Sequence, residues 1–248
     1  VSAQRVSEVL NVDVAIKDTE KLQAFNLEEK GTIEFKNVSF RYPGADEDVI
    51  SNVSFKAFPG ETTAFIGSTG SGKSTLINLI PRFYDVTKGE ILIDGVNIKN
   101  VSQYELREKI GFIPQKGLLF SGTLESNLKY GGEYISDEDI EKASEIAQAV
   151  EFINNKEERF KTEISQGGSN VSGGQKQRLA IARALAKKAE IFIFDDSFSA
   201  LDFKTDARLR SAINKELRNS TVLIVAQRIS TIMNANQIIV LDEGKVVG

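Results

Sequence analysis

A glycine-rich segment constrains what this chain can fold into more than any other feature. It matches the pattern G-x-x-x-x-G-K-[ST]. An apolar run at 62–66 precedes it, and apolar residues at helical spacing follow it up to Pro81. Strand, phosphate-binding loop and helix in this order predict a P-loop nucleotide-binding core. The loop residues are Gly67, Ser68, Thr69, Gly70, Ser71, Gly72, Lys73, Ser74 and Thr75.

The residue types of this loop predict how it holds a nucleotide. Its glycines let successive backbone N–H groups point inward around phosphates, and the N-terminus of the following helix adds partial positive charge. Lys73 is expected to reach the β- and γ-phosphates, and Ser74 is expected to hold Mg²⁺. A chance match on a flexible glycine loop is the alternative, and the flanking strand and helix argue against it.

Two adjacent carboxylates follow a second apolar run. Ile191–Phe194 is expected to form a buried strand, and Asp195 and Asp196 come directly after it. In P-loop proteins an aspartate at the tip of a neighbouring strand completes the Mg²⁺ site, so Asp195 is the expected metal ligand beside Ser74. Aspartates also end strands for reasons of turn geometry alone. Only the combination with the phosphate loop makes this pair informative.

The composition excludes several kinds of site. The sequence contains no histidine and no cysteine, which rules out zinc fingers, histidine-ligated metals and Ser-His-Asp or Cys-His nucleophiles. A formal net charge of -4 argues against a nucleic-acid-binding protein. The longest unbroken apolar run is the five residues Val222–Ala226, far short of the roughly 20 residues of a membrane-spanning helix. We therefore expect membrane contact only through a partner.

The order of the apolar segments predicts the fold class. Alternating apolar and polar residues at 33–40 and 49–58 indicate half-buried strands. Further along the chain, continuous apolar runs alternate with helices, which is the pattern of parallel strands covered on both faces. The runs lie at 191–194, 221–225 and 238–241, and helices are expected at 136–156 and 172–187. The sequence therefore predicts an α/β protein.

A third motif identifies a family that the chain resembles. Val171–Arg178 reads Val-Ser-Gly-Gly-Gln-Lys-Gln-Arg and lies about twenty residues before Asp195. It resembles the signature motif of ATP-binding cassette (ABC) ATPases, and three motifs in the order typical of that family cover residues 31–248. The resemblance implies a P-loop NTPase (RecA-like) core with an N-terminal antiparallel β-subdomain. It also implies an inserted α-helical subdomain at about 113–172, and ATP and Mg²⁺ as cofactors.

The same resemblance assigns roles to single residues. Tyr42 is similar to the aromatic residue that stacks on adenine. Gln115 looks like the glutamine that senses Mg²⁺ and faces the membrane domain. Asp202 ends a stretch, Ser199–Asp202, that looks like the loop crossing the dimer interface. Stacking on a base needs only a π surface, and for Tyr42 the alternative is a turn aromatic that packs on the core.

The signature motif itself predicts an anion site at a helix start. The residues concerned are Ser172, Gly173, Gly174 and Gln175. Their N–H groups would face a phosphate, whereas an ordinary helix capped by Ser172 is the alternative. Because this helix cannot easily fold back onto its own phosphate loop, we expect its target to be the γ-phosphate of a second subunit. In the family, two nucleotides are sandwiched head to tail between two such domains.

Other stretches resemble the exporter branch of the family. These are Leu119–Thr123 and Arg228–Thr231. Residues 1–30 are similar to the segment that joins the last membrane helix to the nucleotide domain. We therefore expect 1–30 to be a linker from a transmembrane domain outside this sequence, and 31–248 to be the nucleotide-binding domain. The expected location is the cytoplasmic face of the cell membrane, as part of an integral membrane transporter.

The chain departs from the family pattern at three places. Asp196 stands where hydrolytically active members have Glu, and Gln227 stands where they have a histidine that touches the γ-phosphate. Ser165-Gln166 replaces an acid that exporters usually show before the signature. ATP hydrolysis needs a base close to the attacking water, and a displacement of about 1 Å can cost about a hundredfold in rate. Gln227 can donate a hydrogen bond but cannot carry charge.

These departures resemble the degenerate subunit of a heterodimeric multidrug-type exporter. The hypothesis is an own ATP site with slow hydrolysis, while Ser172–Gln175 completes a competent site on a second half-transporter. In this reading Lys73, Gln115, Asp196 and Gln227 are the residues of the slow catalytic site. Three alternatives stay open: a hydrolytic homodimer that uses Asp196 as base, a non-transport ABC ATPase acting on DNA or ribosomes, and a regulatory ATP-binding module without chemistry.

Overall fold

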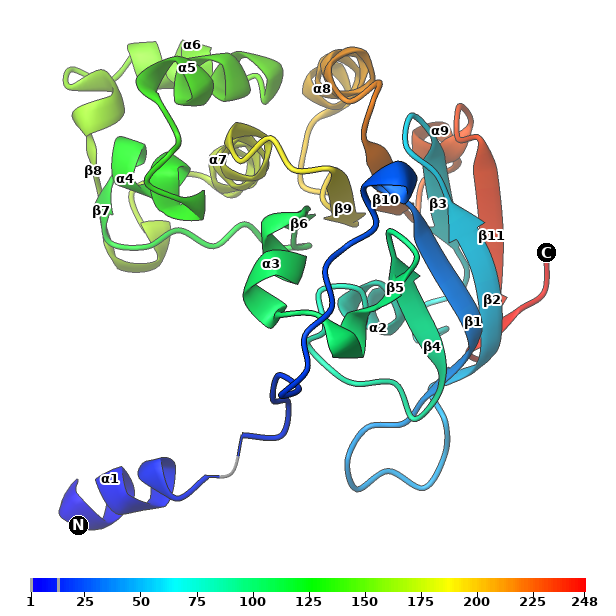
Figure 1. The fold of residues 1–248 in the computed structure, drawn as a ribbon. Helices are drawn as coiled ribbons and strands as arrows, with labels where there is room; N and C mark the ends of the chain where they lie inside the picture. The colour runs from blue at the N-terminus through cyan, green and yellow to red at the C-terminus, as the bar shows by residue number, and fades with distance from the viewer. Residues whose placement is uncertain (1, 13) are drawn as a thin grey trace.

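A largely parallel β-sheet forms the centre of the molecule. The computed structural model describes residues 2–12 and 14–248, and within them this sheet has six strands in the order β12-β11-β3-β10-β9-β6 (Figure 1). Strand β12 pairs antiparallel with β11 at one edge, and all other neighbours pair parallel. The bounds are β3 Thr62–Ile66, β6 Ile110–Ile113, β9 Ile191–Asp195, β10 Thr221–Val225, β11 Gln237–Asp242 and β12 Lys245–Val246.

Both faces of this sheet are covered, which explains its apolar sequence. Every residue of β9 and β10 is buried. Along β9, Phe192 and Phe194 belong to one core cluster, and Ile191 and Ile193 belong to the other. A strand buried on both sides has no polar face, so its sequence cannot alternate. The predicted parallel strands are therefore confirmed.

A second, antiparallel sheet lies beside the first, on the N-terminal part of the chain (Figure 1). Its order is β2-β1-β4-β5. The bounds are β1 Ile33–Phe40, β2 Ile50–Ala57, β4 Lys88–Ile93 and β5 Val96–Asn97. Phe55 stacks on Phe35 at 4.5 Å between ring centroids and meets Phe65 of β3 edge to face at 5.4 Å. This aromatic contact joins the two sheets, and the predicted antiparallel β-subdomain is present.

Helices cover the central sheet and connect its strands. Helix α2 follows the phosphate loop and contacts β9 and β10, while α7 contacts β6. The bounds are α2 Lys73–Asn78, α3 Gln103–Glu108, α7 Gly173–Ala186, α8 Phe203–Glu216 and α9 Ile229–Ile232. The helix expected at 172–187 is thus found with its first and last residues shifted by one, because Ser172 and Lys187 are its caps.

Most of the regular secondary structure between β6 and α7 is helical. It contains α4 Leu124–Leu128, α5 Asp137–Ile146, α6 Val150–Asn154 and a short hairpin of β7 Gly122–Thr123 with β8 Glu163–Ile164. The expectation of one helix over 136–156 is wrong, because Gln148 adopts a left-handed backbone (φ 56°) that separates α5 from α6. Arg178 Nη1 donates to Gln148 O at 2.5 Å and holds this corner against α7.

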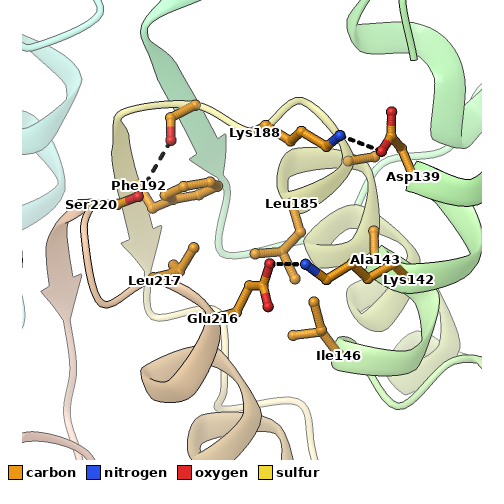
Figure 2. Close-up of a pocket in the computed structure, with 12 residues that line it drawn as sticks. Asp139, Lys142, Ala143, Ile146, Leu185, Lys188, Phe192, Glu216, Leu217 and Ser220 are labelled. Atoms are coloured by element: carbon orange, nitrogen blue, oxygen red, sulfur yellow. Dashed lines mark hydrogen bonds and ion pairs between the residues drawn. The ribbon is translucent and has the colours of Figure 1, made fainter. Parts of the chain in front are cut away.

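Helix α5 meets α7 and α8 along a seam. A cavity of about 170 Å³ lies in this seam. Figure 2 shows Leu185 among the apolar side chains that line it. Two ion pairs cross its rim, Lys142 with Glu216 and Lys188 Nζ with Asp139 Oδ1 at 2.5 Å (Figure 2). Exposed ion pairs contribute about 0–1 kcal/mol, so the buried apolar contacts between α5 and α7 hold most of the seam together.

The N-terminal segment has two parts with different contacts. Helix α1 Ser2–Leu10 lies apart from the rest of the chain (Figure 1), and its Val9 and Leu10 are exposed. Residues 14–30 run along the core instead: Gln23 N donates to Asn100 O at 2.8 Å, and Asp18 Oδ1 accepts from Gln103 Nε2 at 2.9 Å. Throughout the described residues, no helix combines the length and the apolar character needed to cross a membrane.

A buried ion pair stands where this segment enters β1. Asp94 is 0% exposed, and it accepts from Gly31 N at 2.6 Å and pairs with Lys109 Nζ at 2.8 Å. Burial raises the pKa of Asp94. Burial opposes a charged Lys109, but its hydrogen bonds to Asp94 and Glu190 raise its pKa overall. The pair therefore ties the chain before β1 to β4 and β6 through charges held away from water.

Candidate functional site

The phosphate loop is held in place by the strands on both sides of it. Gly67 (φ 150°) lies so close to the end of β11 that a Cβ would sit 2.1 Å from Leu241 O. Gly72 (φ 97°) is the N-cap of α2, and a Cβ there would meet Ile50 Cδ1 at 2.7 Å. A side chain at Gly67 would collide with backbone and displace the loop. At Gly72 the end of the Ile50 side chain could move, so the left-handed backbone is the main reason for glycine there.

Lys73 lies inside the curve of this loop. Its Nζ donates to Gly67 O at 2.9 Å, to Ser68 O at 2.7 Å and to Ser71 Oγ at 3.2 Å. Burial lowers the pKa of Lys73, and the nearby carboxylates of Asp195 and Asp196 oppose that shift. The ammonium group is thus placed among the loop carbonyls and hydroxyls, in the position from which a lysine reaches the phosphates of a bound nucleotide.

The two expected Mg²⁺ ligands contact one another. Ser74 Oγ donates to Asp195 Oδ1 at 2.9 Å, although 121 positions separate the two residues in the sequence. Burial raises the pKa of Asp195; its hydrogen bond with Ser74 opposes that shift. Hydroxyl and carboxylate oxygens are ligands that Mg²⁺ accepts, and it usually takes only one or two protein ligands beside the phosphates and waters. These residues fit a Mg²⁺ ion bound together with a nucleotide.

Asp196 is the centre of a small polar cluster. Its Oδ2 accepts from Gln115 Nε2 at 3.2 Å and from Gln227 Nε2 at 3.1 Å. The residue adopts a left-handed backbone (φ 45°), and its N–H donates to Val225 O at 3.0 Å. Gln115 therefore contacts Asp196 here rather than the pair of Ser74 and Asp195. Two amide side chains from different loops fix one carboxylate oxygen.

One pocket unites nine of the residues that the sequence singled out. It has a volume of about 240 Å³ and lies over the phosphate loop. Its lining consists of Val49, Thr69, Gly70, Gly72, Lys73, Ser74, Thr75, Gln115, Asp196, Val225 and Gln227. The phosphate loop and the three candidate residues of hydrolysis thus surround a single space. The arrangement can hold the phosphates of a nucleotide with a carboxylate and two amides facing them.

Tyr42 stands beside this pocket in an aromatic cluster. Its ring packs edge to face on Phe40 (4.8 Å) and on Tyr84 (5.2 Å), and it is half-buried. Its hydroxyl shares a hydrogen bond of 3.1 Å with Thr75 Oγ1. Tyr42 is therefore attached both to the antiparallel sheet and to the last residue of the phosphate loop. Its role toward adenine stays a prediction.

The signature residues start α7 as a well-capped helix. Gln175 N donates to Ser172 Oγ at 3.3 Å, and Ser172 N donates to Gln175 Oε1 at 2.9 Å, which is a capping box. Ser172 and Gly173 are exposed, and a Cβ on Gly173 would meet open space. In the described part of the chain, Ser172–Gln175 is absent from the lining of the nucleotide pocket.

Asp202 and Phe203 lie at the start of α8, outside the lining of the nucleotide pocket. Asp202 is the N-cap of α8, where its side chain accepts from Thr205 N at 3.0 Å; this hydrogen bond lowers its pKa. Phe203 is 78% exposed, with the guanidinium of Arg228 5.2 Å from its ring. A large exposed aromatic beside a helix start is suited to a protein contact. The role of Asp202 in a dimer stays a prediction.

Two residues near the site were not anticipated from the sequence. Gln177 is 1% exposed, and both atoms of its amide bind the backbone on either side of Gln115. Ser197 Oγ donates to Ile113 O at 2.9 Å and joins the end of β9 to the end of β6. The position of Gln177 carried a signal: it shares the spacing of Ile181 and Ala184 on the apolar face of its helix.

Comparisons with known proteins agree with this geometry. Residues 50–199 match the ABC transporter family. The chain is 42% identical to an uncharacterized ABC transporter ATP-binding protein of Mycobacterium tuberculosis, covering 100% of this chain and 43% of that protein. It is 44% identical over 219 residues to an ATP-dependent lipid A-core flippase of Vibrio vulnificus, covering 88% of this chain and 38% of the flippase. The chain thus spans less than half the length of these relatives.

A solved structure extends the agreement to nearly the whole chain. The structure of a bacterial Atm1-family ABC exporter with ATP bound superimposes with a TM-score of 0.92 at 33% identity, covering 99% of this chain and 43% of that one. The expected P-loop fold with its two subdomains is therefore correct, and so are the expected cofactors, ATP and Mg²⁺. By its phosphate loop, its fold and these matches, the chain belongs to the ABC transporter family, as a nucleotide-binding domain of the exporter type.

Proposed function

We propose that this chain binds Mg-ATP and pairs head to tail with a second cassette, so that ATP powers export by a membrane transporter. Its own ATP site hydrolyses slowly, and its signature residues complete a faster site on a partner subunit. The observation that carries this proposal is the setting of Asp196. A carboxylate one methylene shorter than the family's Glu is bound by Gln115 and Gln227, and no imidazole is present.

Slow hydrolysis is expected from the short side chain of Asp196 and the neutral side chain of Gln227. A general base must lie within about 2.6–3.2 Å of the proton it removes. The backbone hydrogen bond from Asp196 N to Val225 O fixes where its short side chain begins, and two amides fix where it ends. Gln227 offers neutral N–H groups to a phosphate where the family offers an imidazole. The site is thus complete for binding and weak for chemistry.

The exposed position of the signature residues supports a role for them at a partner's ATP site. The N–H groups of Gly173 and Gly174, which the capping box does not use, lie at the start of α7 and outside the lining of the chain's own pocket. A helix N-terminus of this kind favours an anion. Asp202 and the exposed Phe203 present a further surface for a second cassette. We infer a different polypeptide as partner, because a homodimer would contain two weak sites.

The membrane-domain contact is assigned to a groove beside the Gln115 loop. This groove has a volume of about 310 Å³, and its lining includes Phe112, Leu118, Phe120, Tyr130 and Arg183. Leu118 is 68% and Tyr130 64% exposed, and Phe120 stacks on Tyr130 at 4.4 Å. An apolar exposed patch of this kind marks a protein interface. It would hold the chain's own transmembrane domain, for which residues 1–30 are the linker, at the cytoplasmic face of the membrane.

One observation favours a second candidate, a hydrolytic homodimer. Asp196 is a carboxylate that lines the nucleotide pocket together with Lys73 and Ser74. It can accept a proton, so a homodimer using Asp196 as base is chemically possible. The two candidates differ in whether the transporter needs Asp196 for most of its turnover.

Turnover by the whole transporter separates the two candidates. The polypeptide that contains these residues is purified with its associated subunits, and ATP hydrolysis is measured for wild type and for Asp196→Asn. The proposal expects less than a twofold fall, because the faster site lies on the partner. A transporter built from this polypeptide alone that loses nearly all turnover in Asp196→Asn contradicts the proposal and supports the homodimer. Asp242→Asn, at the exposed end of β11, is the matched control.

A further inference from the structure

We propose that Gln177 is a positioning residue: it ties the loop around Gln115 to the first turns of α7, so that the cap at Ser172–Gln175 moves together with that loop. The inference rests on the proposed function, in which this cap serves the partner's ATP site. It adds the element that would carry information from one nucleotide pocket, and from the membrane-domain groove, to the other ATP site.

The hydrogen bonds of Gln177 span the loop. Its Nε2 donates to Pro114 O at 3.1 Å, and its Oε1 accepts from Gly117 N at 2.8 Å. The side chain is 1% exposed, so both bonds are shielded from water. Buried hydrogen bonds of this kind are costly to break because the released groups stay unsatisfied. One amide therefore clamps the backbone on both sides of Gln115.

The loop also rests directly on the helix backbone. A Cβ on Gly117 would lie 2.6 Å from Lys176 O and 3.0 Å from Gln177 Cα. Just beyond the loop, Arg183 Nη2 donates to Leu118 O at 2.9 Å. Close contact and two side-chain anchors leave little freedom for the loop to move independently of α7.

The same turn of α7 holds a second loop. Lys176 Nζ donates to Gly167 O at 2.9 Å, and Gly167 lies in the 3-10 turn Gln166–Gly168 that precedes the signature residues. The capping box of Ser172 with Gln175 then fixes the first turn itself. Residues 176 and 177 thus connect two loops to one rigid helix start.

These contacts form an uninterrupted path from Asp196 in the chain's own pocket to Ser172 at the start of α7. Asp196 Oδ2 accepts from Gln115 Nε2 at 3.2 Å in the chain's own pocket. Gln177 clamps the Gln115 loop, and α7 carries that clamp to Ser172. Loop motion and ATP turnover distinguish this coupling from a buried glutamine that only satisfies the loop backbone.

The first test measures ATP hydrolysis by the assembled transporter. In Gln177→Met the side chain keeps its length and loses both hydrogen bonds. We expect kcat to fall at least tenfold with KM for ATP changed less than twofold, because the phosphate loop is untouched. Gln177→Glu is the conservative rescue: burial favours the neutral acid, which keeps one donor and one acceptor. Gln237→Met, which loses the bond from Thr63 Oγ1, is the matched control and should retain wild-type turnover.

The second test measures the distance between the Gln115 loop and the turn that precedes α7, in the same polypeptide. This stretch contains no cysteine, so Lys116→Cys and Ser169→Cys introduce two labelling sites at exposed positions. Spin-label distances in the assembled transporter are expected to be narrowly distributed with Gln177 or Glu. They should broaden in Gln177→Met. A distribution that stays narrow in Gln177→Met overturns the proposal, as does a Gln237→Met control that loses turnover to the same extent.

Ser172→Ala separates a failure of this inference from a failure of the proposed function. If Ser172→Ala leaves turnover unchanged, the cap does not serve a partner site, and the proposed function fails. If Ser172→Ala lowers turnover and Gln177→Met does not, the cap matters, and the role of Gln177 is overturned. Both variants lowering kcat, with broadened distances only in Gln177→Met, supports the proposal.

Discussion

Gln227 Nε2 donates a hydrogen bond of 3.1 Å to Asp196 Oδ2, across 31 positions of sequence. Gln115 Nε2 donates to the same oxygen at 3.2 Å. The carboxylate next to Asp195, the expected Mg²⁺ ligand, is therefore held by two neutral donors. This triad links three loops that follow β6, β9 and β10, and it is the structural basis for expecting a binding site with weak hydrolysis.

Restoring the family's two residues should speed hydrolysis at the site that we propose to be slow. In Asp196→Glu with Gln227→His, the base reaches about one methylene further, and an imidazole faces the γ-phosphate. We expect turnover at this site to rise at least tenfold, since about 1 Å of misplacement can cost about a hundredfold. The measurement is single-turnover hydrolysis by a transporter whose partner site is inactivated. Unchanged turnover in the double variant, with ATP still bound, would show that other features limit this site.

The signature cap should matter for function beyond its effect on stability. Ser172 and Ser136 form the same capping box, at α7 and α5 respectively. Replacing either serine by alanine should lower the free energy of unfolding by about 1 kcal/mol. Only Ser172→Ala should also lower the transporter's ATP turnover, because in the proposed dimer only that cap faces a second cassette. Denaturant unfolding and ATPase assays on both variants check this; equal losses of turnover would contradict a specific role for Ser172.

Tyr42 should contribute to nucleotide affinity in two separable ways. Tyr42→Ala removes the ring, and stacking of a base on an aromatic side chain contributes about 1–3 kcal/mol. We therefore expect ATP affinity to fall by about 5- to 150-fold. Tyr42→Phe keeps the ring, loses the bond to Thr75, and should weaken ATP less than Tyr42→Ala. Equilibrium ATP titration gives both values. A Tyr42→Ala variant that binds ATP normally but melts earlier would assign Tyr42 to the core alone.

The buried pair of Asp94 and Lys109 should show strong coupling in stability. Lys109→Met leaves the Asp94 carboxylate buried without its partner, and breaking such a pair costs about 3–5 kcal/mol. Burial raises the pKa of Asp94, so part of this loss is relieved when the acid is protonated at lower pH. Adding Asp94→Asn to the Lys109→Met variant keeps the acceptor for Gly31 N and should recover much of the lost stability.

A double-mutant cycle measured by denaturant unfolding tests this coupling. Additive effects of Asp94→Asn and Lys109→Met would show that the two side chains act independently. The direction in which folding stability changes with pH follows from the raised pKa of Asp94. A raised pKa means that the folded state binds the proton more tightly, so wild-type stability at this site falls as pH rises through the acid range.

Short-range patterns in the sequence were enough for much of the fold. The runs in β9 and β10 predict buried parallel strands, because a strand covered on both faces must be apolar throughout. The phosphate loop is equally local, since its glycines and Lys73 follow one another in the chain. The break at Gln148 was missed, because a left-handed glutamine with a carbonyl bound by Arg178 has no local sequence signal.

Residue types and spacing alone predicted the phosphate loop, the strand ends with Asp195 and Asp196, the α/β class and the family resemblance. The tertiary structure decided which side chains meet: Ser74 with Asp195, Gln115 and Gln227 with Asp196, and Gln177 with the loop. The physical reason is that parallel strands bring their carboxyl ends to one edge. Residues far apart in the chain become neighbours only when the order and register of those strands are set.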